Sequence, residues 1–153
     1  MSNMQGKTIF ITGGSRGIGR AIALKAAQAG ANVVIAAKTE VETAKLTGTI
    51  YSVAEEIDAA GGKALPILLD VRDEQQIHAA MQQAARNFGG IDVLINNAGA
   101  IALTGVEATS LKQYDLIQTI NHRATFICAQ AALPYLKQAQ HPHILSLSPP
   151  VNM

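Results

Sequence analysis

The sequence predicts an α/β protein with a doubly wound parallel sheet, because five short apolar segments alternate with segments of helical pattern. The apolar segments are continuous rather than alternating, which is typical of strands buried on both faces of a sheet. Only 4% of the 153 residues are aromatic and none is Trp, so Val, Ile, Leu and Ala must form the core. Right-handed crossovers with one reversal then give the Rossmann-type strand order 3-2-1-4-5. We expect a single domain over residues 1–153.

Each strand is expected where apolar and β-branched residues cluster, and each helix where apolar residues recur every three or four positions. The expected strands cover residues 8–12, 33–36, 64–70, 91–95 and 143–147. The expected helices cover residues 20–28, 49–60, 73–88 and 110–137, the last with a break near Asn121. Gly30 and Gly89 are positioned to end two of these helices, and Asp73 to cap the start of another. Pro149-Pro150 stops the fifth strand, since proline cannot donate to a strand ladder.

Composition and charge exclude several classes of function. The net charge is +1 and no segment concentrates Lys or Arg, which argues against nucleic acid as a partner. No apolar run is long enough for a membrane span and the first residues lack a signal peptide's pattern, so we expect a soluble, cytoplasmic protein. Cys128 has no partner for a disulfide and is expected to be buried in a helix. The four histidines lack the spacing of a metal site, and no metal is expected.

A glycine-rich loop lies between the first expected strand and the first expected helix, where residues 12–19 read TGGSRGIG. A diphosphate at a helix N-terminus meets free backbone N–H groups and the positive end of the helix dipole. Glycine is needed where a side chain would block that approach. The spacing TGxxxGxG moves the tight turn two residues from the GxGxxG pattern, and an ordinary glycine-rich turn is the alternative. The expected phosphate contacts are Gly13, Ser15, Arg16, Gly17, Ile18 and Gly19.

The end of the second strand indicates which dinucleotide binds. NAD sites usually place a carboxylate there, to bond the adenosine ribose. This chain has Ala37 and then Lys38, which with Arg16 would flank a 2′-phosphate and so favours NADP(H). A solvated surface lysine is the alternative reading of Lys38.

The end of the third strand indicates the adenine site. There Asp70 is placed to accept from the adenine amino group, with Val71 lining the ring. The alternative for Asp70, a helix cap, is disfavoured because Asp73 already fills that position.

These motifs together resemble the short-chain dehydrogenase/reductase family across the whole chain: TGGSRGIG (12–19), LDV (69–71), NNAG (96–99) and the Asn in TINHRA. The resemblance implies NADP(H)-dependent exchange of hydride between nicotinamide and an alcohol or carbonyl substrate. It assigns Asn96, Asn97, Ala98 and Gly99 to the end of the fourth strand beside the nicotinamide side of the cofactor, with the last three as cofactor contacts. It assigns Asn121 to the catalytic proton relay, and implies a homo-oligomer by analogy only.

The chain departs from the family pattern at two places. The family's catalytic Ser position is Pro149, which has no donor. Ser148 is a weak substitute because neighbouring strand residues face opposite sides, and Ser146 is weaker still. The family's Tyr-x-x-x-Lys centre is also missing, because Glu, Gln and Ala stand four residues after the three tyrosines. Those tyrosines are Tyr51, Tyr114 and Tyr135.

We therefore interpret the chain as the cofactor-binding part of such a dehydrogenase, truncated after the fifth strand and inactive alone. The alternative is a non-enzymatic dinucleotide-binding or protein-interaction module. Truncation would leave an apolar edge that no charge protects, formed by Ile144, Leu145 and Leu147, and this counts against the module. The substrate is open among steroid, fatty acyl and small ketone compounds, as is a peroxisomal address beyond residue 153.

Overall fold

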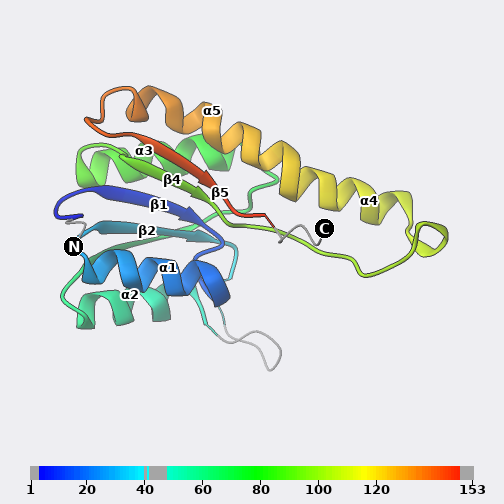
Figure 1. The fold of residues 1–153 in the computed structure, drawn as a ribbon, viewed down its shortest axis with the longest axis horizontal. Helices are drawn as coiled ribbons and strands as arrows, with labels where there is room; N and C mark the ends of the chain where they lie inside the picture. The colour runs from blue at the N-terminus through cyan, green and yellow to red at the C-terminus, as the bar shows by residue number, and fades with distance from the viewer. Residues whose placement is uncertain (1–3, 40, 42–47, 149–153) are drawn as a thin grey trace, which may run out of the picture.

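A five-stranded parallel sheet with helices on both faces forms the centre of the computed structural model, which describes residues 4–39, 41 and 48–148 (Figure 1). The strands are β1 (Thr8–Thr12), β2 (Asn32–Ala37), β3 (Lys63–Leu68), β4 (Val93–Asn96) and β5 (His143–Ser146). Their order in the sheet is β3-β2-β1-β4-β5, and each neighbouring pair is parallel. The predicted Rossmann-type order is confirmed.

The helices form one layer on each face of the sheet. They are α1 (Gly17–Gln28), α2 (Ile50–Ala59), α3 (Glu74–Phe88), α4 (Leu111–Gln118) and α5 (Ala124–Leu136), with a 3-10 turn η1 (Val106–Ala108) and a π-helix η2 (Thr119–Arg123). Helices α1 and α2 pack on one face, and α3 and α5 on the other. Figure 1 shows α4, η2 and α5 as one continuous rod that extends beyond the sheet.

Strand β1 illustrates why the core divides into two clusters. All five of its residues are buried, and consecutive side chains point to opposite faces. Ile9 and Ile11 therefore pack among α1 and α2, whereas Phe10 packs among α3 and α5. Cys128 is 1% exposed in the second of these clusters, which confirms the predicted burial.

Local signals set the helix ends much as the sequence predicts. The Asp73 carboxylate accepts from the backbone N–H groups of Gln75 and Gln76, so Asp73 is the N-cap of α3. Gly89 ends that helix with φ +85, a left-handed conformation that suits glycine. The predicted break in the last helix is confirmed as η2, where one wider turn includes Asn121.

Three element boundaries differ from the predicted ones by two or more residues. Helix α1 begins at Gly17 rather than residue 20, because the glycine-rich loop already turns helical there. Strand β4 begins at Val93 rather than residue 91. Strand β3 ends at Leu68 rather than residue 70: the Leu69 N–H still donates to the Ala37 carbonyl oxygen at 3.0 Å, and the chain then turns toward α3, where the Asp70 N–H donates to Gln76 Oε1 at 3.0 Å.

Candidate functional site

A cleft of about 320 Å³ lies at the carboxyl ends of the strands, between β1 and β4 where the direction of the crossovers reverses. Ligands of open α/β sheets bind at this point. Nine of the predicted cofactor residues line it, namely Gly13, Ser15, Arg16, Lys38, Asp70, Val71, Asn97, Ala98 and Gly99. Gly17 and Ile18 are exposed in the first turn of α1, and Gly19 is buried beneath the loop.

The glycine-rich loop depends on glycine for two physical reasons. Gly13 and Gly17 have φ values of +68 and +54, which side-chain-bearing residues rarely adopt. A Cβ at Gly19 would lie 2.4 Å from the Gly13 carbonyl oxygen and 2.5 Å from Asn97 Nδ2. The loop therefore brings the start of α1 as close to the end of β4 as backbone packing permits.

The N-terminus of α1 is suited to binding an anion. Arg16 occupies the N-cap position without making a capping hydrogen bond within the described residues, and the first turn holds no acidic side chain. The first amides of the helix thus keep their hydrogen-bonding capacity toward the cleft. A dinucleotide diphosphate has the charge and the acceptors that such amides bind.

Thr12 and Asn97 lock the loop to the segment after β4. Thr12 Oγ1 accepts from the backbone N–H groups of Asn97 (3.1 Å) and Ala98 (3.0 Å). Asn97 Nδ2 in turn donates to the carbonyl oxygens of Thr12 (3.0 Å) and Gly13 (2.9 Å). Asn97 therefore supports the floor of the cleft through its side chain. Sequence reasoning misses Thr12, although a buried polar residue at the end of an apolar strand is a usable signal.

A cationic corner lies at the end of β2. Arg16 Nη2 donates to Thr39 Oγ1 at 2.9 Å, while Arg16 Nη1 is buried with no partner among the described residues. The neighbouring Lys38 is exposed, and Ala37 leaves this wall of the cleft without a carboxylate. An unpaired guanidinium nitrogen in a buried position is costly, so this corner is suited to an anionic group. Sequence reasoning misses Thr39, which orients the guanidinium.

Asp70 lies on the wall after β3, with a different environment from the one predicted. Its carboxylate accepts from Arg72 through Nε (2.9 and 3.0 Å), Nη2 and the backbone N–H (3.0 Å). The Arg72 guanidinium holds the pKa of the Asp70 carboxyl below its ordinary value. Asp70 still lines the cleft, and so does Arg72, which sequence reasoning misses.

A second cavity of about 430 Å³ adjoins the first beyond Gly99, and both Asn121 and Ser148 line it. Asn121 Oδ1 accepts from the Ala100 N–H at 2.8 Å, and Nδ2 donates to the Ala100 carbonyl oxygen at 2.8 Å. Thr125 Oγ1 donates to the Asn121 carbonyl oxygen at 2.9 Å. The Asn121 amide thus clamps the segment after the NNAG motif. Pro149, the predicted departure from the family's Ser, lies outside the described residues.

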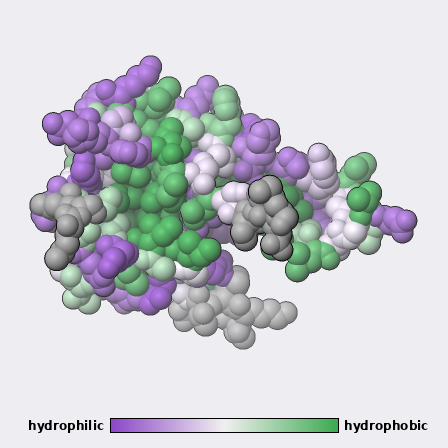
Figure 2. Space-filling view, viewed as in Figure 1, coloured by the Kyte–Doolittle hydropathy of each residue, from purple (hydrophilic) through white to green (hydrophobic). Residues whose placement is uncertain are grey.

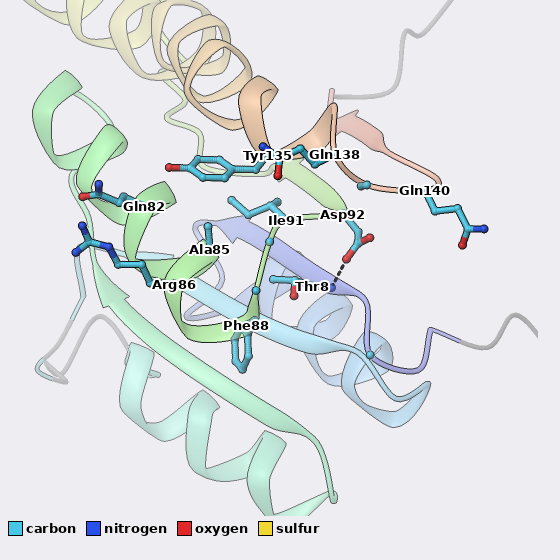
Figure 3. A pocket seen from close by; sticks show the side chains of 14 residues that line it. Thr8, Gln82, Ala85, Arg86, Phe88, Ile91, Asp92, Tyr135, Gln138 and Gln140 are labelled. Atoms are coloured by element: carbon cyan, nitrogen blue, oxygen red, sulfur yellow. Dashed lines mark hydrogen bonds between the residues drawn. The ribbon is translucent and has the colours of Figure 1, made fainter.

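Another cavity, of about 610 Å³, is at the opposite end of the strands, where β1 and β4 begin (Figure 3). Tyr135 and Arg86 line it, and Asp92 Oδ2 accepts there from the Thr8 N–H at 2.8 Å. This position separates Tyr135 from the cleft and excludes it from chemistry beside Asn121. We assign the candidate site to the carboxyl end, because the glycine-rich loop lies there.

The described part of the chain offers little evidence for a metal site, a reactive thiol or a membrane-spanning helix. No group of three His, Cys, Asp or Glu side chains converges there on a point where a metal ion would bind. Burial raises the pKa of the Cys128 thiol to about 12, so the thiol stays protonated at neutral pH. None of the helices in those ranges combines the length and apolar content that a membrane crossing needs.

Comparison with known proteins identifies the family. A family model described as short chain dehydrogenase matches residues 7–150. The chain belongs to the short chain dehydrogenase family. Hydroxysteroid dehydrogenase-like protein 2 from Danio rerio is 60% identical over 150 residues, and the human protein of that name is 58% identical. The crystal structure of a short chain dehydrogenase from Mycobacterium thermoresistibile is 49% identical and superposes with a TM-score of 0.93.

These relatives are longer than the chain. The matched region covers 98% of this chain but 36% of the Danio rerio and human proteins. Against the Mycobacterium thermoresistibile structure it covers 98% of this chain and 54% of that one. The chain therefore spans about a third of the length of the curated relatives. It shares with them the oxidoreductase fold of the family.

Proposed function

We propose that the chain binds NADP(H) as the cofactor-binding part of a short-chain dehydrogenase that interconverts an alcohol and a carbonyl substrate. Arg16 carries this proposal, because its Nη1 is buried without a partner among the described residues beside the exposed Lys38. A 2′-phosphate would supply the missing acceptors, and charge-assisted hydrogen bonds of this type are roughly twice as strong as neutral ones. The ribose hydroxyls of NAD(H) carry no such charge.

The remaining residues of the cleft fit the rest of the dinucleotide. The amides at the start of α1 would bind the diphosphate, and Gly17, where a Cβ would meet nothing within 4 Å, leaves room for it. Asp70 would accept from the adenine amino group, with Val71 against the ring. When bound, the nicotinamide supplies or accepts the hydride. The clamp between Asn121 and Ala100 would hold the backbone after Gly99 beside it.

Proton transfer to and from the substrate is the step for which this chain offers the fewest candidate side chains. We propose that Asn121 belongs to the proton relay and that Ser148, which lines the same cavity, is the candidate hydrogen-bond donor to the substrate oxygen. The 153 residues contain no Tyr followed by Lys four positions later. We therefore expect the chain to bind the cofactor without turning over a substrate. Turnover of cyclohexanol or a steroid alcohol by the purified chain with NADP would contradict this.

The cofactor preference is tested by titrating NADPH and NADH into the wild type and the variants Arg16→Gln and Lys38→Asp. Each variant should weaken NADPH binding about tenfold or more, since a charged hydrogen bond is worth about 1.5–3 kcal/mol. NADH binding should change less than about twofold in Arg16→Gln, because NADH lacks the phosphate that this side chain would bind.

Arg20→Gln is the matched control, since Arg20 also lies on α1 but pairs with Glu56 at the surface. It should leave the NADPH to NADH ratio unchanged. Equal affinity of the wild type for both dinucleotides would overturn the preference for NADP(H). Binding of neither would overturn the dinucleotide site itself and favour the interaction module.

A further inference from the structure

The Asp70 carboxylate already has hydrogen-bond partners on the wall of the cleft. Arg72 donates to both of its oxygens through Nε, to Oδ2 through Nη2, and to Oδ1 through its backbone N–H. A carboxylate offers about four lone-pair positions, and these contacts occupy them. An adenine amino group that reaches Asp70 must therefore displace at least one contact from Arg72.

We propose that Arg72 is a specificity-determining residue that competes with the adenine amino group for Asp70. The proposal rests on the proposed dinucleotide site. When adenine binds, the Arg72 side chain moves away while the Asp70 backbone stays in place. Three observations support this assignment.

The first observation is that the backbone around Asp70 is held independently of Arg72. The Asp70 N–H donates to Gln76 Oε1 at 3.0 Å, and Gln76 Nε2 donates to Asp73 Oδ2 at 3.1 Å. Asp73 is itself the N-cap of α3. The Asp70 backbone therefore cannot shift without disturbing the start of a helix.

The second observation is the difference in exposure between the two partners. The Arg72 side chain is 47% exposed and that of Asp70 26% exposed, so the guanidinium can move into solvent at little cost. The third is that both residues line the cleft beside Val71. A ring seated against Val71 would meet the carboxylate and the guanidinium at once.

This arrangement distinguishes purine rings by the group at position 6. An amino group donates a hydrogen bond, so Asp70 strengthens its binding. Arg72 weakens that binding, because it competes for the same carboxylate. An oxo group accepts, so it is repelled by Asp70 and can take a hydrogen bond from the Arg72 guanidinium. Arg72 thus lowers the affinity for an adenine dinucleotide and narrows its advantage over a hypoxanthine dinucleotide.

The test is a titration of NADPH and of its reduced hypoxanthine analogue into the wild type and Arg72→Gln. Arg72→Gln should tighten NADPH about two- to fivefold, the range expected when a surface ion pair no longer competes. The hypoxanthine analogue should bind equally or more weakly. In an Asp70→Ala background, Arg72→Gln should leave NADPH affinity unchanged, because the acceptor for which both groups compete has been removed.

Arg123→Gln is the control for loss of a positive charge, since the Arg123 side chain is about as exposed as that of Arg72 and pairs with Glu74 outside the cleft. It should leave the ratio of the two affinities unchanged. Weaker or unaltered NADPH binding by Arg72→Gln, or an equal change for both analogues, would overturn the competition while leaving the dinucleotide site standing. A wild type that binds no dinucleotide would overturn both.

Discussion

Gly19 has no room for a side chain, although it lies inside a helix where Ala is normally preferred. A Cβ would meet the Gly13 carbonyl oxygen and Asn97 Nδ2 at 2.4 and 2.5 Å, and neither can move without opening the loop. We expect Gly19→Ala to lower the free energy of unfolding by about 1–3 kcal/mol, the usual range for overpacking. NADPH affinity should fall about tenfold or more, since the amides of the loop would be displaced.

Gly105→Ala is the control for Gly19→Ala, because nothing lies within 4 Å of a Cβ at that position. Thermal unfolding and NADPH titration measure both effects. A Gly19→Ala protein with unchanged Tm and unchanged affinity would show that the loop approaches β4 less closely than the structure has it.

Cys128 should make stability depend on pH in the alkaline range. Burial raises its pKa from 9.0 to about 12, so the folded state keeps a proton that the unfolded state loses. The stabilisation is therefore complete below pH 9 and is lost as the pH rises toward 12. At pH 8, iodoacetamide should label the folded protein at least about a hundredfold more slowly than the unfolded protein, because the thiolate is the reactive form.

Cys128→Ala provides the control for that experiment. Cys128 is the only cysteine in the sequence, so this variant should take up no label. It should also lose the part of the alkaline destabilisation that comes from the thiol. Equal labelling of the folded and unfolded wild type would contradict the burial of this side chain.

The predicted site residues follow from local backbone requirements, whereas the missed ones depend on contacts that form only in the folded structure. Gly13 and Gly17 were predictable, because a strand, a tight turn and a helix in succession already require glycine there. Thr39 and Gln76 were not, because their roles appear only when Thr39 meets Arg16 and when a turn brings Gln76 back to Asp70. Arg72 was missed because its sequence position is typical of a solvated helix start.

At the scale of elements, strand ends were the least predictable feature. Hydropathy continues through Leu69, which is 1% exposed, so the apolar pattern extends beyond β3. The strand nevertheless ends earlier, because the chain turns toward α3 after Leu69 and the Asp70 N–H donates to Gln76 in that turn. The π-helix η2 was predictable only as a break, since a poor helix former marks the place but not the kind of turn.

Asn121 should act as the clamp that fixes the segment following the NNAG motif. Asn121→Ala removes two hydrogen bonds to Ala100, each worth about 0.5–1.5 kcal/mol net and less where exposed, so we expect a loss of about 1 kcal/mol in stability. Amide hydrogen exchange at Ala100 should accelerate, because its N–H loses its acceptor. Asn121→Asp keeps that acceptor but loses the donor, so the Ala100 amide should stay protected.

Gln118→Ala is the control for the clamp, because Gln118 is an exposed residue at the end of α4. It should leave exchange at Ala100 unchanged. If the Ala100 amide of Asn121→Ala exchanges no faster than that of the wild type, then other contacts hold this segment and the predicted role of Asn121 is wrong.

At the scale of the whole molecule, the two edges of the sheet differ in protection. The β3 edge carries Lys63 and Pro66, two residues that discourage pairing with another strand. The β5 edge carries neither kind of residue, and all four of its residues are exposed. The sheet order was predictable because crossover handedness and continuous apolar strands leave few topologies.

The helices also cover the sheet unequally. Helix α1 packs over β1 and β2, and α2 over β2 and β3. Leu145 pairs in register with Ile95, whose side chain faces the α1 side, so Leu145 lies on that same face and is 48% exposed. Figure 2 shows a hydrophobic band over the β5 side of the sheet toward α1. The predicted exposure of Ile144, Leu145 and Leu147 is confirmed.

This surface should make the 153-residue chain self-associate, because unprotected apolar edges pair with one another. We expect the apparent mass in light scattering to rise with protein concentration, and Leu145→Lys to shift the chain toward the monomer mass of 16.0 kDa. Leu68→Lys is the control, since Leu68 is 49% exposed on the edge that Lys63 and Pro66 already protect. It should change the association little. A wild type that stays monomeric at every concentration, or equal effects of the two lysines, would show that the β5 edge does not drive association.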